Sequence, residues 1–182
     1  MKKITVHRSR RIFKPSWSWA GTLGLAAFLA WRAISGSFQP ATHPEGLPLH
    51  PVKVVRVIDG DTVVIEGGEK IRYIGVDTPE LAHHNRPVQF YAVEATRANS
   101  ALVEGKTVQL VFDRELRDKY HRILAYVYAG PTLVNAFLVQ EGYGKVLIIP
   151  PNTRHADEFL ALQRKARQEK KGIWSDENPR RR

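Results

Sequence analysis

The stretch of sequence that decides the fold runs from residue 52 to residue 80 and reads VKVVRVIDGDTVVIEGGEKIRYIGVDTPE. Its β-branched and apolar runs predict three strands, at residues 52–58, 62–65 and 70–76. Gly67 and Gly68 predict a hairpin turn between the second and third strands, because glycine adopts positive φ at little cost. Alternation along the third strand predicts one face with Ile71, Tyr73 and Gly75 and another with Arg72, Ile74 and Val76.

Two short acidic segments follow these strands. Residues 59–62 (Asp-Gly-Asp-Thr) come after the first strand, and residues 77–80 (Asp-Thr-Pro-Glu) come after the third. The hairpin that joins the strands lets the carboxylates at their ends converge on one point, and Arg72 lies on the strand that leads to Asp77. Several carboxylates and an arginine at one point indicate a site for a hard cation and a phosphate. We interpret Asp59 as a structural turn residue beside this site.

The sequence after residue 80 predicts helices and further strands. We expect a polar loop at 81–87, a helix over 89–104 that ends at Gly105, a strand at 107–112, a charged loop at 113–121, a strand at 123–128, a turn at 130–131, a short helix over 132–140 and a basic helix over 156–171. Five short strands with an inserted helix suit a small closed antiparallel barrel of the OB type, an α+β fold with about three helices.

Residues 1–35 differ from the rest of the chain in charge and hydropathy. They contain seven Lys and Arg residues and no Asp or Glu, and residues 17–31 are apolar and rich in small side chains. A basic stretch before an apolar one predicts an export signal or a signal anchor, although about 16 residues is short for a span of about 20. Residues 9–14 (SRRIFK) also resemble a twin-arginine export signal.

This order of basic and apolar residues predicts an exported protein with its folded part outside the cytoplasm. The protein is expected in the periplasm or the extracellular space, or on the inner membrane if the N-terminal segment is not cleaved. A helix packed in a core and an amphipathic organelle presequence are the alternatives. Residues 36–51 contain four prolines and are expected to be a linker, residues 52–176 the folded domain, and residues 177–182 a basic tail.

The composition narrows the chemistry. The absence of cysteine excludes thiol catalysis, disulfides and thiolate zinc sites. The net charge of +10 is misleading, because after residue 35 the chain has 21 basic and 18 acidic side chains. The folded part is therefore close to neutral, and any attraction for phosphate must come from the local placement of charges.

Taken in order, several pieces of the chain resemble the staphylococcal (micrococcal) nuclease family, also called thermonucleases, over about residues 52–176. The resemblance rests on residues 57–62, 72–80, 94–95, 118–122, 134–136, 142–146 and 172–175. It implies an OB-fold barrel with helices. It also implies an enzyme that uses one Ca²⁺ to hydrolyse DNA and RNA with little sequence preference, leaving 3′-phosphates. A monomer is the default expectation, because no feature of the sequence indicates an oligomer.

The resemblance also implies a metal site. Asp61 and Asp77 would bind Ca²⁺ through their carboxylates, and Thr78 would bind it through its backbone carbonyl. This set suits calcium chemically, because Ca²⁺ takes oxygen ligands in flexible arrangements and fills open positions with water.

The same resemblance implies five residues that act on the substrate. Arg72 and Arg122 would grip the scissile phosphate, and Glu80 would orient or deprotonate the attacking water. Lys119 and Tyr120 would contact a neighbouring phosphate. Arginine suits the first task because its planar guanidinium makes paired hydrogen bonds to phosphate oxygens.

One departure from the family keeps other functions open. The family's type member has base-binding tyrosines after the Lys-Val that corresponds to Lys145-Val146, whereas this chain has residues 147–151 (Leu-Ile-Ile-Pro-Pro). A nucleic-acid-binding OB-fold module with weak or no catalysis is therefore an alternative. A tethered structural or interaction protein is another.

Overall fold

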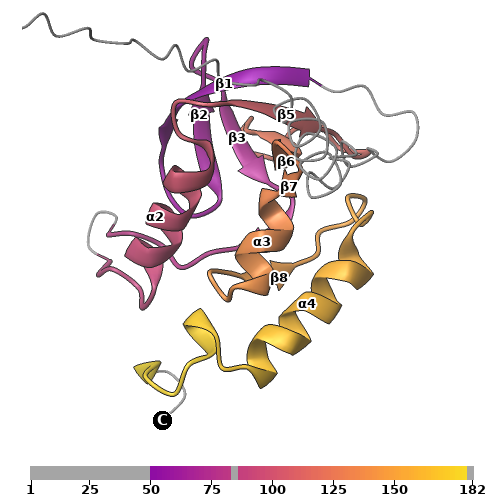
Figure 1. Ribbon diagram of the computed structural model, residues 1–182. Helices are drawn as coiled ribbons and strands as arrows, with labels where there is room; N and C mark the ends of the chain where they lie inside the picture. Colours follow the sequence, from indigo (N-terminus) through magenta and orange to yellow (C-terminus); the bar gives the residue numbers. More distant parts are fainter. Residues whose placement is uncertain (1–49, 83–85, 180–182) are drawn as a thin grey trace, which may run out of the picture. The chain divides into compact units, whose positions relative to one another are not determined.

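The computed structural model describes residues 50–82 and 86–179, which belong to one compact unit (Figure 1). The predicted export segment, the linker up to residue 49 and the last three residues of the basic tail lie outside the described residues. No helix in the described part of the chain is long and apolar enough to cross a membrane.

Five strands form a closed barrel: β1 (His50–Val57), β2 (Thr62–Ile65), β3 (Lys70–Tyr73), β5 (Thr107–Val111) and β6 (Ile123–Ala129). Their order is β3-β2-β1-β5-β6, and these neighbours are antiparallel. The barrel closes through a parallel pairing of β3 with β6. The predicted five-stranded barrel of the OB type is therefore confirmed, although its closure is parallel rather than antiparallel.

The predicted strand at residues 70–76 is divided by a bend into β3 and β4 (Gly75–Asp77). Gly75 has a φ of +81°, and a Cβ at this position would lie 2.7 Å from Cε2 of Phe159. Only glycine fits such a bend without strain. The predicted alternation of faces is wrong beyond the bend, because Val76 packs in the same buried cluster as Ile71 and Tyr73.

Two further short strands were not predicted. β8 (Lys145–Leu147) pairs antiparallel with β4 and forms a separate two-stranded ribbon. β7 (Thr132–Leu133) pairs with β6, where the sequence had indicated the first turn of a helix. Both strands are only two or three residues long, too short for a periodic pattern to show.

Within residues 50–82 and 86–179, three α-helices accompany the barrel: α2 (Ala92–Val103), α3 (Val134–Gln140) and α4 (Ala156–Gln168), with a 3-10 helix at Gly172–Trp174. α2 begins at Ala92 rather than at residue 89, because Tyr91 has a left-handed φ of +70°. α4 ends at Gln168 rather than at residue 171, and Lys170 is again left-handed, with a φ of +52°.

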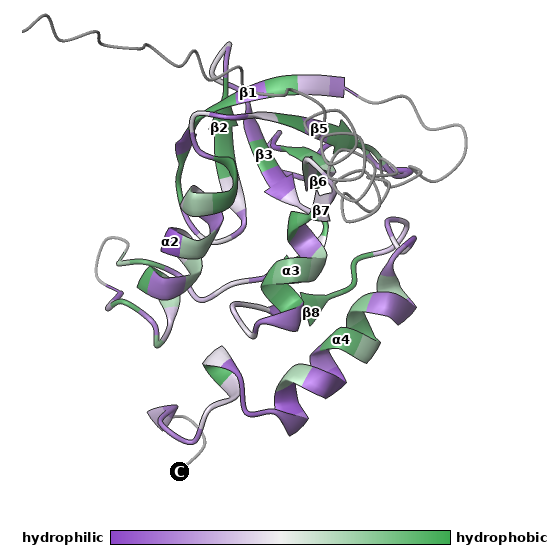
Figure 2. Cartoon of the chain, viewed as in Figure 1, coloured by the Kyte–Doolittle hydropathy of each residue, from purple (hydrophilic) through white to green (hydrophobic). Residues whose placement is uncertain are grey.

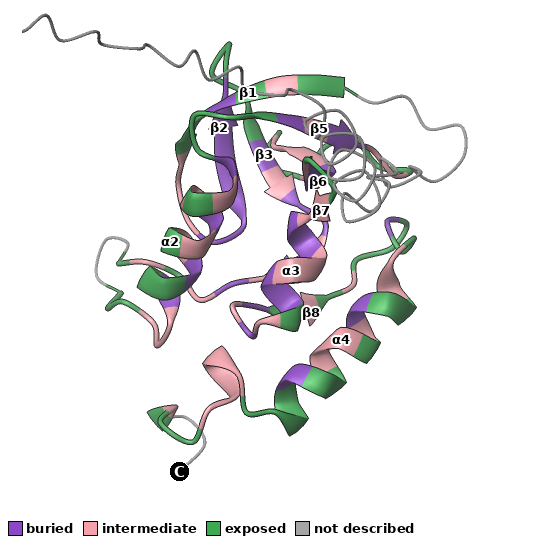
Figure 3. Cartoon of the chain, viewed as in Figure 1, coloured by how far each residue is buried: buried purple, intermediate pink, exposed green. Residues whose placement is uncertain are grey.

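The hydrophobic core fills the barrel and extends to α3. β2 is buried along its whole length, and Leu138 and Val139 of α3 belong to the same cluster. A second cluster joins Ile74 and Tyr126 to Phe159 of α4. β2 is hydrophobic in Figure 2 and buried in Figure 3, whereas much of α4 is hydrophilic and exposed. Residues at the ends of β2, β3 and β4 are therefore attached to well-packed strands.

Candidate active site

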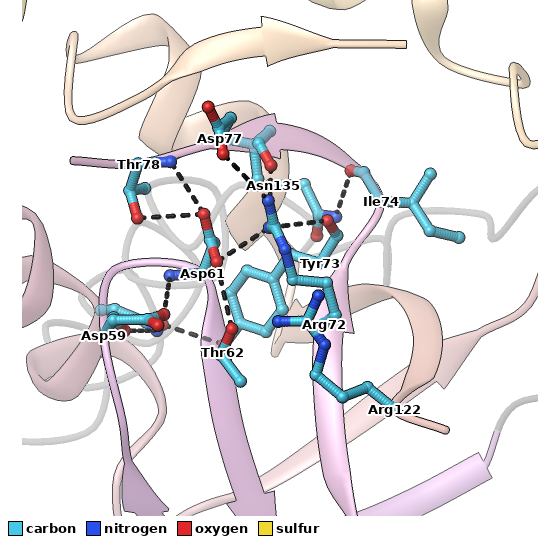
Figure 4. Close-up of polar contacts among 12 residues, drawn as sticks. Asp59, Asp61, Thr62, Arg72, Tyr73, Ile74, Asp77, Thr78, Arg122 and Asn135 are labelled. Carbon is cyan, nitrogen blue, oxygen red and sulfur yellow. Dashed lines mark hydrogen bonds and ion pairs between the residues drawn. The ribbon is translucent and has the colours of Figure 1, made fainter. Parts of the chain in front are cut away.

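The two acidic segments converge next to β3 (Figure 4). Asp61 immediately precedes β2, Asp77 ends β4, and both contact the guanidinium of Arg72 on β3. Asp61 Oδ1 lies 2.8 Å from Arg72 Nη1, and Asp77 Oδ1 lies 3.3 Å from Arg72 Nη2. The structure therefore brings these three predicted site residues together.

Asp61 is buried, and both of its carboxylate oxygens accept hydrogen bonds. Oδ2 accepts from the backbone N–H of Thr78 at 2.8 Å and from its Oγ1 at 3.0 Å, while Oδ1 accepts from Thr62 Oγ1 at 3.1 Å. Gly60 makes room for Thr78, since a Cβ at Gly60 would lie 2.6 Å from Thr78 Oγ1. Burial raises the pKa of Asp61 to about 6, although the charge of Arg72 lowers it. A nearby cation stabilises the charged form of such a carboxylate.

The guanidinium of Arg72 is fixed by backbone carbonyls as well as by carboxylates. Nη1 donates to the carbonyl oxygen of Val76 at 2.8 Å and to that of Tyr73 at 3.2 Å. These carbonyls flank the bend at Gly75, so the bend that divides the strand also provides acceptors for the arginine. The side chain of Arg72 is only 12% exposed, and its position is set by the barrel.

Asp118 organises the loop between β5 and β6 that carries the other predicted phosphate contacts. Its Oδ1 accepts from the backbone N–H groups of Tyr120 at 2.9 Å and Arg122 at 3.0 Å, and its Oδ2 accepts from Arg122 Nε at 2.7 Å. Burial opposes ionisation of Asp118, but these hydrogen bonds outweigh it and hold the pKa of Asp118 below its usual range. Arg122 is thus positioned by hydrogen bonds within its own turn that the carboxylate of Asp118 accepts.

Lys119 and Tyr120 lie on the same loop. Tyr120 is 67% exposed, and the centre of its ring lies 5.1 Å from Lys119 Nζ and 5.5 Å from Arg122 Cζ. Both distances are within the range of cation–π attraction. The ring of Tyr120 therefore holds two cations at one place on the protein surface.

An open cleft of about 560 Å³ contains both groups of residues. Seven of the eight predicted site residues line it: Asp61, Arg72, Asp77, Glu80, Lys119, Tyr120 and Arg122. The eighth, Thr78, is only 5% exposed and does not line this cleft. Leu147 and Ile149, both exposed, form an apolar part of the wall. The predicted site is therefore one continuous surface with charged and apolar parts.

The groups that face the cleft suit a hard cation. In residues 50–82 and 86–179, no group of three or more His, Cys, Asp or Glu side chains is placed to hold a metal ion. Asp61 and Asp77 are the candidate ligand pair because their carboxylates converge on one guanidinium. Carbonyl, water and phosphate oxygens would complete the set. Such an all-oxygen set fits Ca²⁺. The carbonyl of Thr78 as a further ligand stays a prediction.

Two buried asparagines support the acidic side of the cleft, which consists of Asp61, Arg72 and Asp77. The sequence had indicated no role for either asparagine. Asn99 of α2 accepts from Tyr73 Oη at 2.9 Å and donates to the backbone oxygen of Asp59 at 3.1 Å. Asn135 of α3 accepts from the N–H of Val127 at 2.9 Å and donates to the carbonyl of Ile74 at 2.8 Å. An amide on the buried face of a helix is the signal for such a role, because a buried polar group requires partners.

A third asparagine supports the loop side of the cleft, which carries Lys119, Tyr120 and Arg122. Asn152, which is 5% exposed, accepts from the N–H of Glu115 at 2.8 Å and donates to its carbonyl oxygen at 2.8 Å. Arg117 adds a second support from the surface, since its two Nη groups lie 3.1 and 3.0 Å from the carboxylate of Glu69. Both residues hold the loop that carries Arg122, and neither was predicted.

A barrel of the OB type with paired carboxylates and two arginines in one cleft defines a protein suited to hold a cation and a phosphate. A model of the family described as Staphylococcal nuclease homologue matches residues 70–176. The chain is 39% identical over 127 residues to the thermonuclease of Staphylococcus hyicus, covering 68% of this chain and 75% of that protein. It is 43% identical over 129 residues to the endonuclease YncB of Bacillus subtilis, covering 68% and 61%. The chain belongs to the staphylococcal nuclease family.

Proposed function

We propose that this nuclease uses Ca²⁺ to hydrolyse phosphodiester bonds in DNA and RNA with little sequence preference, leaving 3′-phosphate ends. One observation carries the proposal. A single cleft contains the carboxylates of Asp61 and Asp77, the guanidinium groups of Arg72 and Arg122, and the carboxylate of Glu80. Oxygen ligands for a hard cation therefore lie beside arginines suited to a phosphate.

The cation would be held by Asp61 and Asp77, with the backbone carbonyl of Thr78 and with water. When bound, Ca²⁺ supplies positive charge at the non-bridging oxygens of the phosphate. Arg72 now pairs with both carboxylates. Nη1 is also held by the carbonyls of Tyr73 and Val76, whereas Nη2 contacts Asp77, so Nη2 is the donor that would reach a phosphate oxygen.

The two arginines stabilise charge on the phosphate as phosphorus becomes five-coordinate. Donors that are already aimed at the site need no reorganisation when the charge develops, and this is the main source of their catalytic effect. Arg72 is oriented by the carbonyls of Tyr73 and Val76. Arg122 is oriented by Asp118, which contacts its backbone N–H and, within the guanidinium, its Nε. This contact leaves both Nη groups directed to the substrate.

Glu80 is the candidate general base. Its side chain is exposed in the cleft, and its backbone oxygen accepts a hydrogen bond from Gln89 at 3.0 Å, which fixes the chain after β4. From this position its carboxylate would orient the attacking water and take its proton. Lys119 and Tyr120 would hold a neighbouring phosphate, where exposed cations act through charge and are weakened by salt.

The apolar part of the wall supports the proposed lack of sequence preference. Leu147 and Ile149 are 38% and 58% exposed. Their side chains offer no hydrogen-bonding groups, and base edges are distinguished mainly by hydrogen bonds. A nucleobase packed on this wall would be held by contact alone, so purines and pyrimidines would both be accepted.

The proposal is tested with defined DNA and RNA oligonucleotides incubated with the protein in Ca²⁺, in Mg²⁺ and in EGTA. Mass spectrometry of the products then identifies the ends. We expect cleavage of both nucleic acids in Ca²⁺, with 3′-phosphate and 5′-hydroxyl ends, and none in EGTA. Cleavage in EGTA would contradict the metal role, and 5′-phosphate ends would contradict the assigned chemistry. Binding by folded protein without cleavage in any metal would identify a nucleic-acid-binding module instead.

We also propose that the protein acts outside the cytoplasm, either released or held at the membrane by its N-terminal segment. The support is the basic and then apolar sequence of residues 1–35. The test is protease accessibility in intact bacterial cells with a permeable outer membrane. Digestion of the folded part without lysis is expected, and protection until lysis would contradict the proposal.

A further inference from the structure

The short ribbon of β4 and β8 places a lysine directly against a candidate metal ligand. Asp77 and Lys145 are opposite each other in the register of this antiparallel pair, where side chains are in direct contact. Lys145 Nζ lies 3.1 Å from Asp77 Oδ2, while Asp77 Oδ1 faces Arg72. Each oxygen of Asp77 is thus held by a different cation.

The backbone fixes this arrangement from both sides. Gly144 has no room for a side chain, because its Cβ would lie 2.7 Å from Val76 Cγ2 and 3.0 Å from the backbone oxygen of Asp77. On the other side of Lys145, the N–H of Val146 donates to Gln163 Oε1 of α4 at 2.8 Å. The lysine is therefore presented to Asp77 by packing against the metal-binding segment itself.

Lys145 does not line the cleft that contains the two arginines. It lines instead a smaller cavity of about 110 Å³ with Asp77, Thr78 and Pro79. It is therefore not positioned as a substrate contact. Its ammonium group meets the candidate metal site at Asp77.

We propose that Lys145 is a positioning residue that holds one oxygen of Asp77 and weakens the affinity of the site for a divalent cation. This inference rests on the proposed Ca²⁺ site. Asp61 and Asp77 carry two negative charges, and Arg72 and Lys145 balance them with two positive charges. A cation that binds without substrate therefore meets a pair of candidate ligands whose charge is already balanced by two cations.

Two effects of Lys145 act in opposite directions. Orienting Asp77 favours the cation only slightly, because it restricts one short side chain with few rotamers to lose. Repulsion between the ammonium group and a divalent ion acts over a few ångströms and, at this partly exposed position, is the larger effect. Removing the charge is therefore expected to tighten Ca²⁺ binding about tenfold, less at high salt.

The test is isothermal titration of the full chain with Ca²⁺ in the absence of nucleic acid, for Lys145→Met, Lys145→Arg and a control. Lys53→Met is a matched control, because Lys53 is similarly exposed and pairs with Glu66 on another part of the barrel. We expect Lys145→Met to bind Ca²⁺ about tenfold more tightly than the unmodified protein. Lys145→Arg and Lys53→Met should stay within about twofold of it.

The outcomes separate this inference from the metal proposal. Equal or weaker binding by Lys145→Met, with clear binding by the unmodified protein and none by Asp77→Asn, overturns the inference and leaves the Ca²⁺ site in place. Absence of Ca²⁺ binding by the unmodified protein overturns both. Tighter binding by Lys53→Met as well as by Lys145→Met would show a general charge effect and would also overturn the assigned role.

Discussion

The acidic side and the loop side of the cleft are built in different ways. Asp61 precedes the barrel strand β2, Arg72 lies on the barrel strand β3, and Asp77 ends β4 in the adjoining ribbon. Hydrogen bonds join these segments, from Arg72 to the carbonyl of Val76 and from the N–H of Thr78 to Asp61. Arg122 belongs to a surface loop, where Asp118 four residues earlier supplies its carboxylate contact. The side chain of Arg72 is 12% exposed and that of Arg122 is 28% exposed. The first arginine is part of the barrel, and the second is part of a local turn.

This difference shows how one site combines rigidity with access. The metal-binding side needs fixed geometry, and strand ends in a packed barrel provide it. The loop side must admit a long, charged polymer, and an exposed turn leaves the cleft accessible to it. Opposite pKa shifts follow from the same difference, since burial raises the pKa of Asp61 while hydrogen bonds outweigh burial and lower that of Asp118.

The largest effects are expected for the arginines themselves. Arg72→Lys and Arg122→Lys should each lower turnover about 100-fold or more, because lysine cannot reproduce the paired donors. Their stabilities should differ. Arg72→Lys leaves two carboxylates and two carbonyls with a poorer partner and should cost about 2 kcal/mol of unfolding free energy, whereas Arg122→Lys should cost little. Turnover and urea unfolding of both variants provide the measurement, and near-normal turnover in either would remove that arginine from the mechanism.

The next largest effect is on stability and concerns the acidic side. Asn135→Ala should lower the free energy of unfolding by about 3 kcal/mol, because it leaves the buried N–H of Val127 and the carbonyl of Ile74 without their partner. Urea unfolding followed by tryptophan fluorescence measures this loss. A loss below about 1 kcal/mol would mean that the bend before β4 is held by other contacts.

A smaller effect, of a different kind, is expected on the loop side. Asn152→Ala removes both hydrogen bonds to Glu115 and loosens the loop that carries Lys119 and Tyr120. The substrate KM should rise about fivefold to tenfold, equivalent to roughly 1 kcal/mol of binding, while kcat falls less. Steady-state kinetics in saturating Ca²⁺ separates the two constants. A lower kcat with an unchanged KM would instead place Asn152 with the catalytic arginines.

The smallest effect is a pH dependence of stability. Because the pKa of Asp118 is lowered in the folded state, its contribution is present above the usual pKa of an aspartate, about 4, and is lost as pH falls through the lower folded value. The stability difference between the protein and Asp118→Asn should thus be constant at pH 5–7 and shrink below pH 4. The pair is partly exposed, so this difference should stay below about 1 kcal/mol. A difference that grows toward acid pH would contradict the assigned hydrogen bonds.

Much of the barrel and most of the site residues can be predicted from local sequence. The β-branched runs predict β1, β2 and β3, and the paired glycines predict the hairpin between β2 and β3, because strand and turn preferences act over a few residues. The acidic residues stand at the strand ends, so their convergence follows from the hairpin. The structure places seven of the eight predicted site residues in one cleft.

The features that were missed depend on contacts between distant parts of the chain. Phe159 of α4 packs against the bend at Gly75 and leaves no room for a side chain there. Asn152 forms its hydrogen bonds with Glu115, which belongs to another loop. Lys145 meets Asp77 only because two short strands pair. No pattern within a short window shows these partners, since each is defined by the closed fold.

The most direct test of the central claim is the effect of Asp77→Asn on cleavage in Ca²⁺ and on binding in EGTA, measured with the same oligonucleotide. The amide keeps the size of the side chain and removes the charge that would hold the cation. Turnover should fall to less than about one-hundredth, while the affinity measured by fluorescence anisotropy in EGTA changes by less than about threefold. Turnover close to that of the unmodified protein would contradict the account, because the acidic side of the cleft would then not be the centre that performs catalysis.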